Sequence, residues 1–203
     1  MYRILTLEDT VRVPPKRFSE ELDKAIASEL EEMIACKIDR DIGLLLTTIS
    51  VEKVSEGKII IGDGAIYYDV VFKVLVYQPM IHEVVEGVIS EVTEFGAFVN
   101  FGPMDGLIHV SQIAEDYMNY DAKNAMLTGK ESHKTLTVGD IVRARIVAVS
   151  LKERLPDCKI GLTMRQPYLG KPEWIEMEKK QAQERAKAEA EMEEKNKGEK
   201  GEK

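Results

Sequence analysis

Residues 85–101 read Val-Glu-Gly-Val-Ile-Ser-Glu-Val-Thr-Glu-Phe-Gly-Ala-Phe-Val-Asn-Phe, and residues 106–112 read Gly-Leu-Ile-His-Val-Ser-Gln. A run of β-forming residues leads into a Phe-Gly-Ala-Phe corner, and a second short run and a glycine-led third run follow. Further along the chain, two more β-rich runs complete the pattern. The sequence therefore predicts a five-stranded barrel with strands near 83–92, 97–101, 106–110, 140–150 and 158–164.

Alternation within the second run assigns its two faces. Ala97, Val99 and Phe101 are apolar and share one face, which we expect to form the core. Phe98 then projects to the outside, beside Phe95 at the corner.

The corner and the Gly-Leu-Ile-His-Val-Ser segment resemble an S1 domain, an OB-type barrel that binds single-stranded RNA. The resemblance covers about Glu83 to Gln166. Aromatic rings suit such a surface because every nucleobase has a π face, so that stacking needs no particular base. Phe95 and Phe98 are therefore predicted to stack on RNA. The alternative is that both rings only fill the end of the barrel.

The same resemblance implies a role for His109, since S1 domains carry a histidine at this point of the RNA groove. The alternative is an ordinary polar strand residue. His82 and His133 lack ligand-like spacing to His109, so a metal site is not expected.

Basic side chains on the last two strands form a candidate phosphate-contacting stripe: Arg143, Arg145 and Lys159. The alternative is that they are solvated surface charges. S1 domains that bind RNA well commonly have an aspartate at the end of the fourth strand and an arginine on the fifth. Here Ser150 and Lys159 occupy these positions, which argues against tight or base-selective binding.

The first 80 residues predict a different architecture. Residues 2–13 read as a strand, and residues 44–54 and 66–77 read as two more. Between the first two, a four-residue spacing predicts one amphipathic helix with a packed stripe of Phe18, Leu22, Ile26, Leu30 and Ile34. The fold class is thus an α+β N-terminal domain, one helix on an antiparallel sheet, followed by an all-β S1/OB-fold five-stranded barrel.

The expected domains are 1–80, 81–170 and a charged tail, 171–203, which reads as a solvated helix that frays into disorder. A glycine-punctuated loop at 55–65 carries three consecutive isoleucines. A long polar excursion, 114–137, interrupts the barrel, and so long a connection is usually functional or flexible.

Composition narrows the function classes. The net charge is −8, with 28 Lys and Arg against 36 Asp and Glu, so a strong salt-driven grip on nucleic acid is not expected. Cys36 and Cys158 are far apart and form no Cys-x-x-Cys pair, which suits two buried thiols in a reducing cytoplasm. The sequence shows no signal peptide and no apolar run of membrane-spanning length, so no membrane association is expected.

No catalytic motif is present: the phosphate loop, the Gly-x-Ser-x-Gly elbow and the His-Glu-x-x-His pair are all missing from the sequence. The chain is expected to carry no catalytic residues and to need no cofactor.

The combination of a one-helix α+β domain with an S1 domain resembles the E′ family of archaeal DNA-directed RNA polymerase subunits, the counterparts of the seventh subunit of eukaryotic RNA polymerase II. Three segments support the resemblance: residues 72–79, Phe-Lys-Val-Leu-Val-Tyr-Gln-Pro; residues 101–104, Phe-Gly-Pro-Met; and residues 168–170, Tyr-Leu-Gly. It spans about residues 1–172.

This resemblance implies a non-catalytic stalk component of a nucleotidyltransferase complex. Its implied partners are the small helical F subunit of the RNA polymerase, with which it would form a heterodimer, the polymerase core subunits and single-stranded RNA. The loop matches the family's core-docking loop, with docking residues Ile59, Ile60, Ile61, Gly62, Asp63 and Gly64.

The alternative for the loop is an ordinary hairpin connection. The alternatives for the chain are a free-standing S1 protein, associated with the exosome or with translation, and an RNA-processing enzyme, which the missing catalytic motifs disfavour.

Overall fold

The computed structural model describes residues 1–35, 37–177 and 179–180. By contacts, the chain divides into two compact units, Met1–Glu83 with Val149–Lys159, and Val84–Ala148 with the chain from Ile160 onward. The predicted three-part division, with boundaries after residues 80 and 170, stays a prediction. Within the described residues, no helix is long and apolar enough to cross a membrane.

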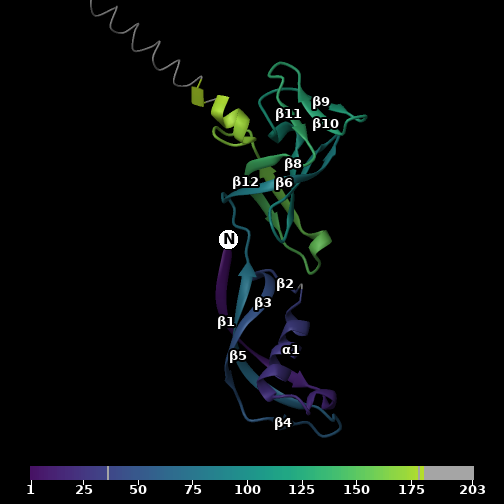
Figure 1. Ribbon diagram of the computed structural model, residues 1–203, viewed down its shortest axis with the longest axis vertical. Helices are drawn as coiled ribbons and strands as arrows, with labels where there is room; N and C mark the ends of the chain where they lie inside the picture. Colours follow the sequence, from purple (N-terminus) through teal and green to yellow (C-terminus); the bar gives the residue numbers. More distant parts are fainter. Residues whose placement is uncertain (36, 178, 181–203) are drawn as a thin grey trace, which may run out of the picture. The chain divides into compact units, whose positions relative to one another are not determined.

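The first unit is a curved antiparallel sheet with one helix on one face (Figure 1). Its strands are β1 (Tyr2–Val13), β2 (Ile38–Asp39), β3 (Gly43–Val54), β4 (Lys58–Ile59) and β5 (Ile66–Tyr77). The sheet order is β1-β5-β3-β2, and β4 pairs with β5. β1 and β5 pair along their whole lengths, from Tyr2 opposite Tyr77 to Val13 opposite Ile66.

Helix α1 (Leu22–Ile34) covers the sheet with the stripe that its sequence predicts, but only in part. Ala25, Ile26, Leu30 and Ile34 are buried, whereas the predicted Phe18 and Leu22 are exposed. Phe18 lies outside α1, because residues 15–17 form a separate 3-10 turn that Phe18 caps, and Leu22 is the first residue of α1. The prediction of one continuous stripe from Phe18 was therefore wrong at its first two positions.

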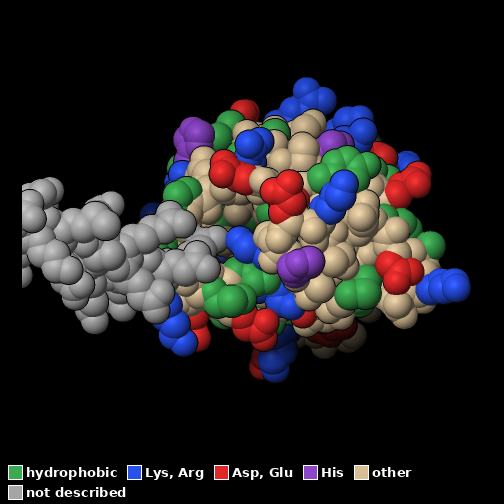
Figure 2. Space-filling model, turned by 90° about the horizontal axis from the view of Figure 1, so that it is seen from above, with side chains coloured by type: hydrophobic (Ala, Val, Ile, Leu, Met, Phe, Trp, Pro, Cys, Tyr) green, Lys and Arg blue, Asp and Glu red, His purple; other side chains and the backbone are tan. Residues whose placement is uncertain are grey.

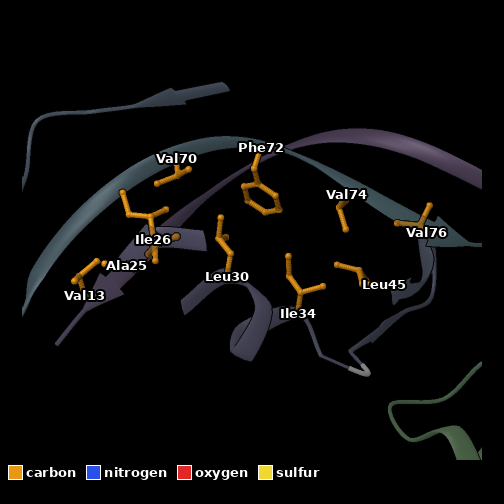
Figure 3. Close-up of a cluster of buried hydrophobic side chains, with 11 residues drawn as sticks. Val13, Ala25, Ile26, Leu30, Ile34, Leu45, Val70, Phe72, Val74 and Val76 are labelled. Carbon is orange, nitrogen blue, oxygen red and sulfur yellow. The ribbon is translucent and has the colours of Figure 1, made fainter. Parts of the chain in front are cut away.

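The core of this unit lies between α1 and the sheet (Figure 3). Phe72 and Leu30 project toward one another from strand and helix, and valines from β1 and β5 surround them. Burying each large apolar side chain stabilises the fold by roughly 1.5–3 kcal/mol, so these contacts decide which face of the sheet the helix covers.

A closed barrel, in the order β12-β13-β8-β7-β6, belongs to the second unit except for its strand-end residues Val149, Ser150 and Lys159. Its strands are β6 (Val84–Thr93), β7 (Gly96–Asn100), β8 (Asp105–His109), β12 (Ile141–Ser150) and β13 (Lys159–Thr163). The predicted α+β domain and five-stranded barrel are thus confirmed, and each barrel strand lies within a residue or so of its predicted range. Two short 3-10 turns, Val110–Gln112 and Leu155–Asp157, follow β8 and precede β13.

The excursion between β8 and β12 is itself a three-stranded sheet, which sequence reasoning missed. It consists of β9 (Met118–Asp121), β10 (Met126–Gly129) and β11 (Thr135–Thr137), in the order β11-β10-β9. After the barrel, residues 172–177 and 179–180 are helical, as expected for the start of the tail. The predicted fraying of residues 181–203 and the thiol of Cys36 lie outside the described residues.

Candidate functional site

The outer face of the barrel presents the two predicted phenylalanines together. Phe95 is 46% exposed and Phe98 is half-buried, and their ring centroids lie 6.1 Å apart with planes at 89°. This is a favourable edge-to-face arrangement. Ala97, Val99 and Phe101 are buried on the opposite face of the strand, as predicted.

Gly96 makes the corner between the rings possible. A Cβ atom at this position would lie 2.1 Å from the carbonyl oxygen of Ile108, so any other residue would push β7 away from β8. Around the corner, the Thr93 hydroxyl donates to the carbonyl of Gly96 at 2.9 Å, and the Val110 N–H donates to the carbonyl of Phe95 at 2.9 Å.

His109 lies at the same corner, because it is the cross-strand partner of Gly96. Its side chain is exposed, and its Nδ1 accepts from the Ser111 N–H at 3.3 Å and lies 2.9 Å from Ser111 Oγ. These contacts occupy Nδ1 and fix the ring, so Nε2 is the nitrogen that a ligand can reach. Phe95, Phe98 and His109 therefore form one surface, which we call the aromatic face.

The predicted cations do not join this face as one stripe. The Arg143 guanidinium donates to Glu86 Oε1 from Nε at 3.0 Å and from Nη2 at 2.5 Å. Glu86 pairs with Arg143, whereas Glu91 pairs with Phe98. At about 3.3 Å per residue, these two glutamates lie roughly 16 Å apart along β6, so Arg143 is remote from the rings.

Arg145 and Lys159 are placed differently. Arg145 is half-buried, and its Nε has no hydrogen-bond partner within the part of the chain that is described. Lys159 is exposed at the start of β13. Two positions later on this strand, Gly161 lies opposite Leu107 of β8, the strand that carries His109. Of the three cations, Lys159 is the one whose strand runs beside the aromatic face.

The electrostatics of the barrel surface are mixed. Glu91 lies directly opposite Phe98 in the ladder and is exposed. On the view in Figure 2, Lys and Arg side chains are interspersed with Asp and Glu side chains, and no continuous basic surface is seen. Such a surface suits stacking better than counterion release.

The loop between β3 and β5 is the second candidate surface. Its three isoleucines, Ile59, Ile60 and Ile61, are 75%, 51% and 102% exposed. Gly62 turns the chain directly after them with φ of +97°, a left-handed conformation that favours glycine. Gly64 has open space around it apart from Pro15, 3.6 Å from where its Cβ would lie.

Asp63 ties the end of this loop to the sheet. Its carboxylate accepts from Arg12 and from Tyr67, and these bonds hold the pKa of Asp63 well below its usual range. Within the described residues, no group of three or more His, Cys, Asp or Glu side chains is arranged to hold a metal ion.

Both halves of the chain match known families. Residues 78–160 match the S1 RNA binding domain, and residues 8–64 match the SHS2 domain found in the N terminus of Rpb7p/Rpc25p/MJ0397. The chain is 44% identical over 182 residues to DNA-directed RNA polymerase subunit Rpo7 of Saccharolobus shibatae, covering 89% of this chain and 100% of that one.

The chain belongs to the Rpo7 family of DNA-directed RNA polymerase subunits. The resemblance predicted from the sequence is thereby confirmed. Because the members of this family are RNA polymerase subunits, the chain is a subunit of an enzyme complex.

More distant relatives of this Rpo7 family share much of the chain. DNA-directed RNA polymerase III subunit RPC8 of Bos taurus is 26% identical over 162 residues, 77% of this chain and 79% of that one. Among solved structures, Mycoplasma genitalium RNase R matches with 26% identity and a TM-score of 0.35, over 40% of this chain and 13% of the other.

Sequence reasoning missed part of the aromatic face in this Rpo7 family member. Leu107 is half-buried and lies opposite both Phe98 and Gly161, so it extends the apolar floor between the rings and β13. The sequence contained this signal, because Leu107 lies two residues before His109 on the same strand and therefore shares its outer side.

Proposed function

We propose that this chain is a non-catalytic stalk component of archaeal DNA-directed RNA polymerase. It pairs with the small helical F subunit, called the helical partner below, and docks to the polymerase core through its N-terminal domain. Through its S1 domain it contacts emerging single-stranded RNA. Its place in the cell is proposed to be the cytoplasm.

The observation that carries the RNA-binding role is the aromatic face. Two phenylalanine rings at right angles, with one of them half-exposed and a fixed histidine beside them, give bases a surface for stacking. Because Arg143 is paired with Glu86 and the acidic Glu91 lies opposite Phe98, binding is expected to be weak and to have a shallow salt dependence.

The docking role is supported by the three exposed isoleucines. A fully exposed isoleucine gains nothing in the isolated chain, and burial in an apolar socket stabilises a complex by roughly 1.5–3 kcal/mol per side chain. Large apolar anchors of this kind are what core docking requires.

Pairing with the helical partner is supported by the sheet of the first unit. On the side away from α1, Tyr2 and Ile4 are exposed on β1. Ile4 lies opposite Leu75, and the ring of Tyr2 lies 4.9 Å from the ring of Tyr77, so the exposed residues continue into an apolar row. A helical protein that packs on this row would raise the melting temperature of the chain.

The experiment is affinity purification of the full-length chain from native extract. Recovery of the large polymerase subunits together with the helical partner is the expected result. Recovery of exosome or ribosomal components in their place would support a free-standing S1 protein and overturn the stalk assignment. A melting temperature unchanged at saturating helical partner would overturn the pairing alone.

A further inference from the structure

The docking loop is attached to the sheet at both of its ends. Two neighbouring pairs of the β1–β5 ladder, Thr10 with Asp69 and Arg12 with Tyr67, alternate with the buried Val11 and so lie on the side away from α1. The loop contacts these two pairs through one charged side chain at each end. Lys58, before the isoleucines, contacts Asp69, and Asp63, after them, contacts Arg12 and Tyr67.

The Asp63 end is held by four hydrogen bonds to one carboxylate. Arg12 donates from Nε to Oδ2 at 2.9 Å and from Nη2 to Oδ1 at 2.8 Å. The Tyr67 hydroxyl donates to Oδ2 at 2.6 Å, and the Ala65 N–H donates to Oδ1 at 3.2 Å. A two-pronged arginine–carboxylate pair fixes direction as well as distance.

The Lys58 end is held by Asp69. Lys58 Nζ lies 2.6 Å from Asp69 Oδ2, and the Thr10 hydroxyl donates to Asp69 Oδ1 at 2.8 Å. The Ser55 N–H also donates to the carbonyl of Asp69 at 2.9 Å. The three isoleucines therefore protrude from a short segment whose two ends are fixed to the same patch of sheet.

We propose that Asp63 and Lys58 are positioning residues, which hold Ile59, Ile60 and Ile61 in their docking conformation before the polymerase core is met. The proposal rests on the docking role proposed above. The Asp63 carboxylate is already occupied by Arg12, Tyr67 and Ala65, so it serves the loop itself and makes no direct contact with the core. Ordering the loop in advance lowers the entropy that binding must remove.

The test is a charge swap across the stronger anchor, made in the full-length chain with the helical partner present and titrated against polymerase core that lacks both proteins. Asp63→Arg alone and Arg12→Asp alone are each expected to weaken core binding about tenfold. The double variant Arg12→Asp/Asp63→Arg restores an ion pair with reversed polarity and is expected to bind within about threefold of the parent.

A matched control reverses an ion pair that is remote in sequence from the loop. Lys24 Nζ lies 2.7 Å from Glu21 Oε2, and both side chains are exposed. Glu21 directly precedes α1, and Lys24 lies in its first turn. Glu21→Lys/Lys24→Glu is expected to leave core binding unchanged, which separates the anchor from a general effect of charge.

Hydrogen exchange in the unbound chain provides a readout that does not depend on the core. The backbone N–H of residue 63 donates to the carbonyl of Ile60, so its exchange reports on the loop whichever side chain stands at position 63. Each single variant is expected to speed exchange at this amide, and the swap is expected to slow it again.

The outcomes separate the two proposals. A double variant that binds as weakly as Asp63→Arg would show that Asp63 contacts the core directly and would overturn the positioning role. Loss of binding in Ile60→Asp/Ile61→Asp with normal binding and normal exchange in Asp63→Arg would overturn the positioning role and leave docking intact. Normal binding by Ile60→Asp/Ile61→Asp would overturn the docking assignment itself.

Discussion

Two long connections in this chain are each organised about one aspartate, but one buries its apolar side chains and the other exposes them. The docking loop between β3 and β5 turns about the carboxylate of Asp63, and the β9–β11 excursion folds about the carboxylate of Asp116. Asp116 accepts from the N–H groups of Tyr117, Glu131 and Ser132 and from the Ser132 hydroxyl, at 2.6–3.0 Å. In each case one aspartate accepts the hydrogen bonds of a turn that lies beside short paired strands.

The difference lies in where the apolar side chains point. In the excursion, Met118, Leu127 and Leu136 are buried on the small sheet, whose strand β10 contacts β6 of the barrel, so the chain covers these apolar side chains itself. In the docking loop, the isoleucines point into solvent. A connection whose apolar residues are buried within the chain needs no partner to cover them, whereas one that exposes its apolar residues while its polar groups are satisfied offers a surface to a partner.

The largest effect is expected from a double substitution in the docking loop that removes core binding and leaves the fold intact. Ile60→Asp/Ile61→Asp should abolish binding to the polymerase core, because desolvating two carboxylates in an apolar socket is costly. The same charges on an exposed loop are tolerated, so pairing with the helical partner should be kept. Co-sedimentation with core checks the first expectation, and co-purification with the helical partner serves as its control.

A stability comparison tests whether the apolar side chains of the excursion stabilise the fold of the chain. Leu127→Ala should lower the free energy of unfolding by about 2–5 kcal/mol, because Leu127 is fully buried. Ile61→Ala, the matched truncation on the docking loop, should change it by no more than about 0.5 kcal/mol. Urea denaturation measures both, and equal losses would contradict the distinction between the two connections.

The next prediction concerns RNA and separates the barrel from its excursion. Phe98→Ala should weaken single-stranded RNA binding by the equivalent of ~1–3 kcal/mol for the base it stacks, to the same extent at low and high salt. Tyr117 on the excursion is 72% exposed, and Tyr117→Ala should bind RNA like the parent. The measurement is RNA titration of the chain, paired with its helical partner, at two salt concentrations.

The reverse pattern, with affinity lost in Tyr117→Ala and kept in Phe98→Ala, would place the RNA path on the excursion. Because Arg143 is already paired with Glu86, Arg143→Ala should flatten the salt dependence less than Lys159→Ala.

The smallest expected effect is the acid response of the excursion. The Ser132 N–H, the first of several donors, lowers the pKa of Asp116 from 3.8 to about 2. A carboxyl group whose pKa is lowered by folding stabilises the fold at pH values above its ordinary pKa. This contribution is lost as the pH falls from about 4 to about 2. Asp116→Asn should therefore melt lower at pH 7 and show a smaller further drop between pH 4 and pH 2. An equal drop in parent and variant would contradict this role.

Much of the fold was predictable because its long elements carry their own periodicity. The alternation of residues 66–77 and the four-residue spacing of Ile26, Leu30 and Ile34 are local signals, and the structure confirms both. The strands β2, β4 and β9–β11 were missed because each has only two to four residues, too few for alternation to show. At Phe18 the same apolar spacing continued past the true start of α1, and it misled.

The arrangement of charged side chains was not predictable in this way. Glu86 meets Arg143, and Arg12 meets Asp63, only because distant strands align in one register. A shift of one residue in either ladder would turn these side chains to the other face of the sheet. The sequence therefore indicated which residues are charged, and the strand pairing decides which of them pair with one another.

The full-length pairing of β1 with β5 has a consequence for synthesis. Residue 2 pairs with residue 77 and residue 13 with residue 66, so the strand that is made first acquires its neighbour last. Chains emerge at roughly 5–20 residues per second, so β1 waits for several seconds while its intended neighbour is translated. During that interval it is an unpaired, partly apolar edge, which makes the nascent first unit most open to misassociation just before its sheet can close.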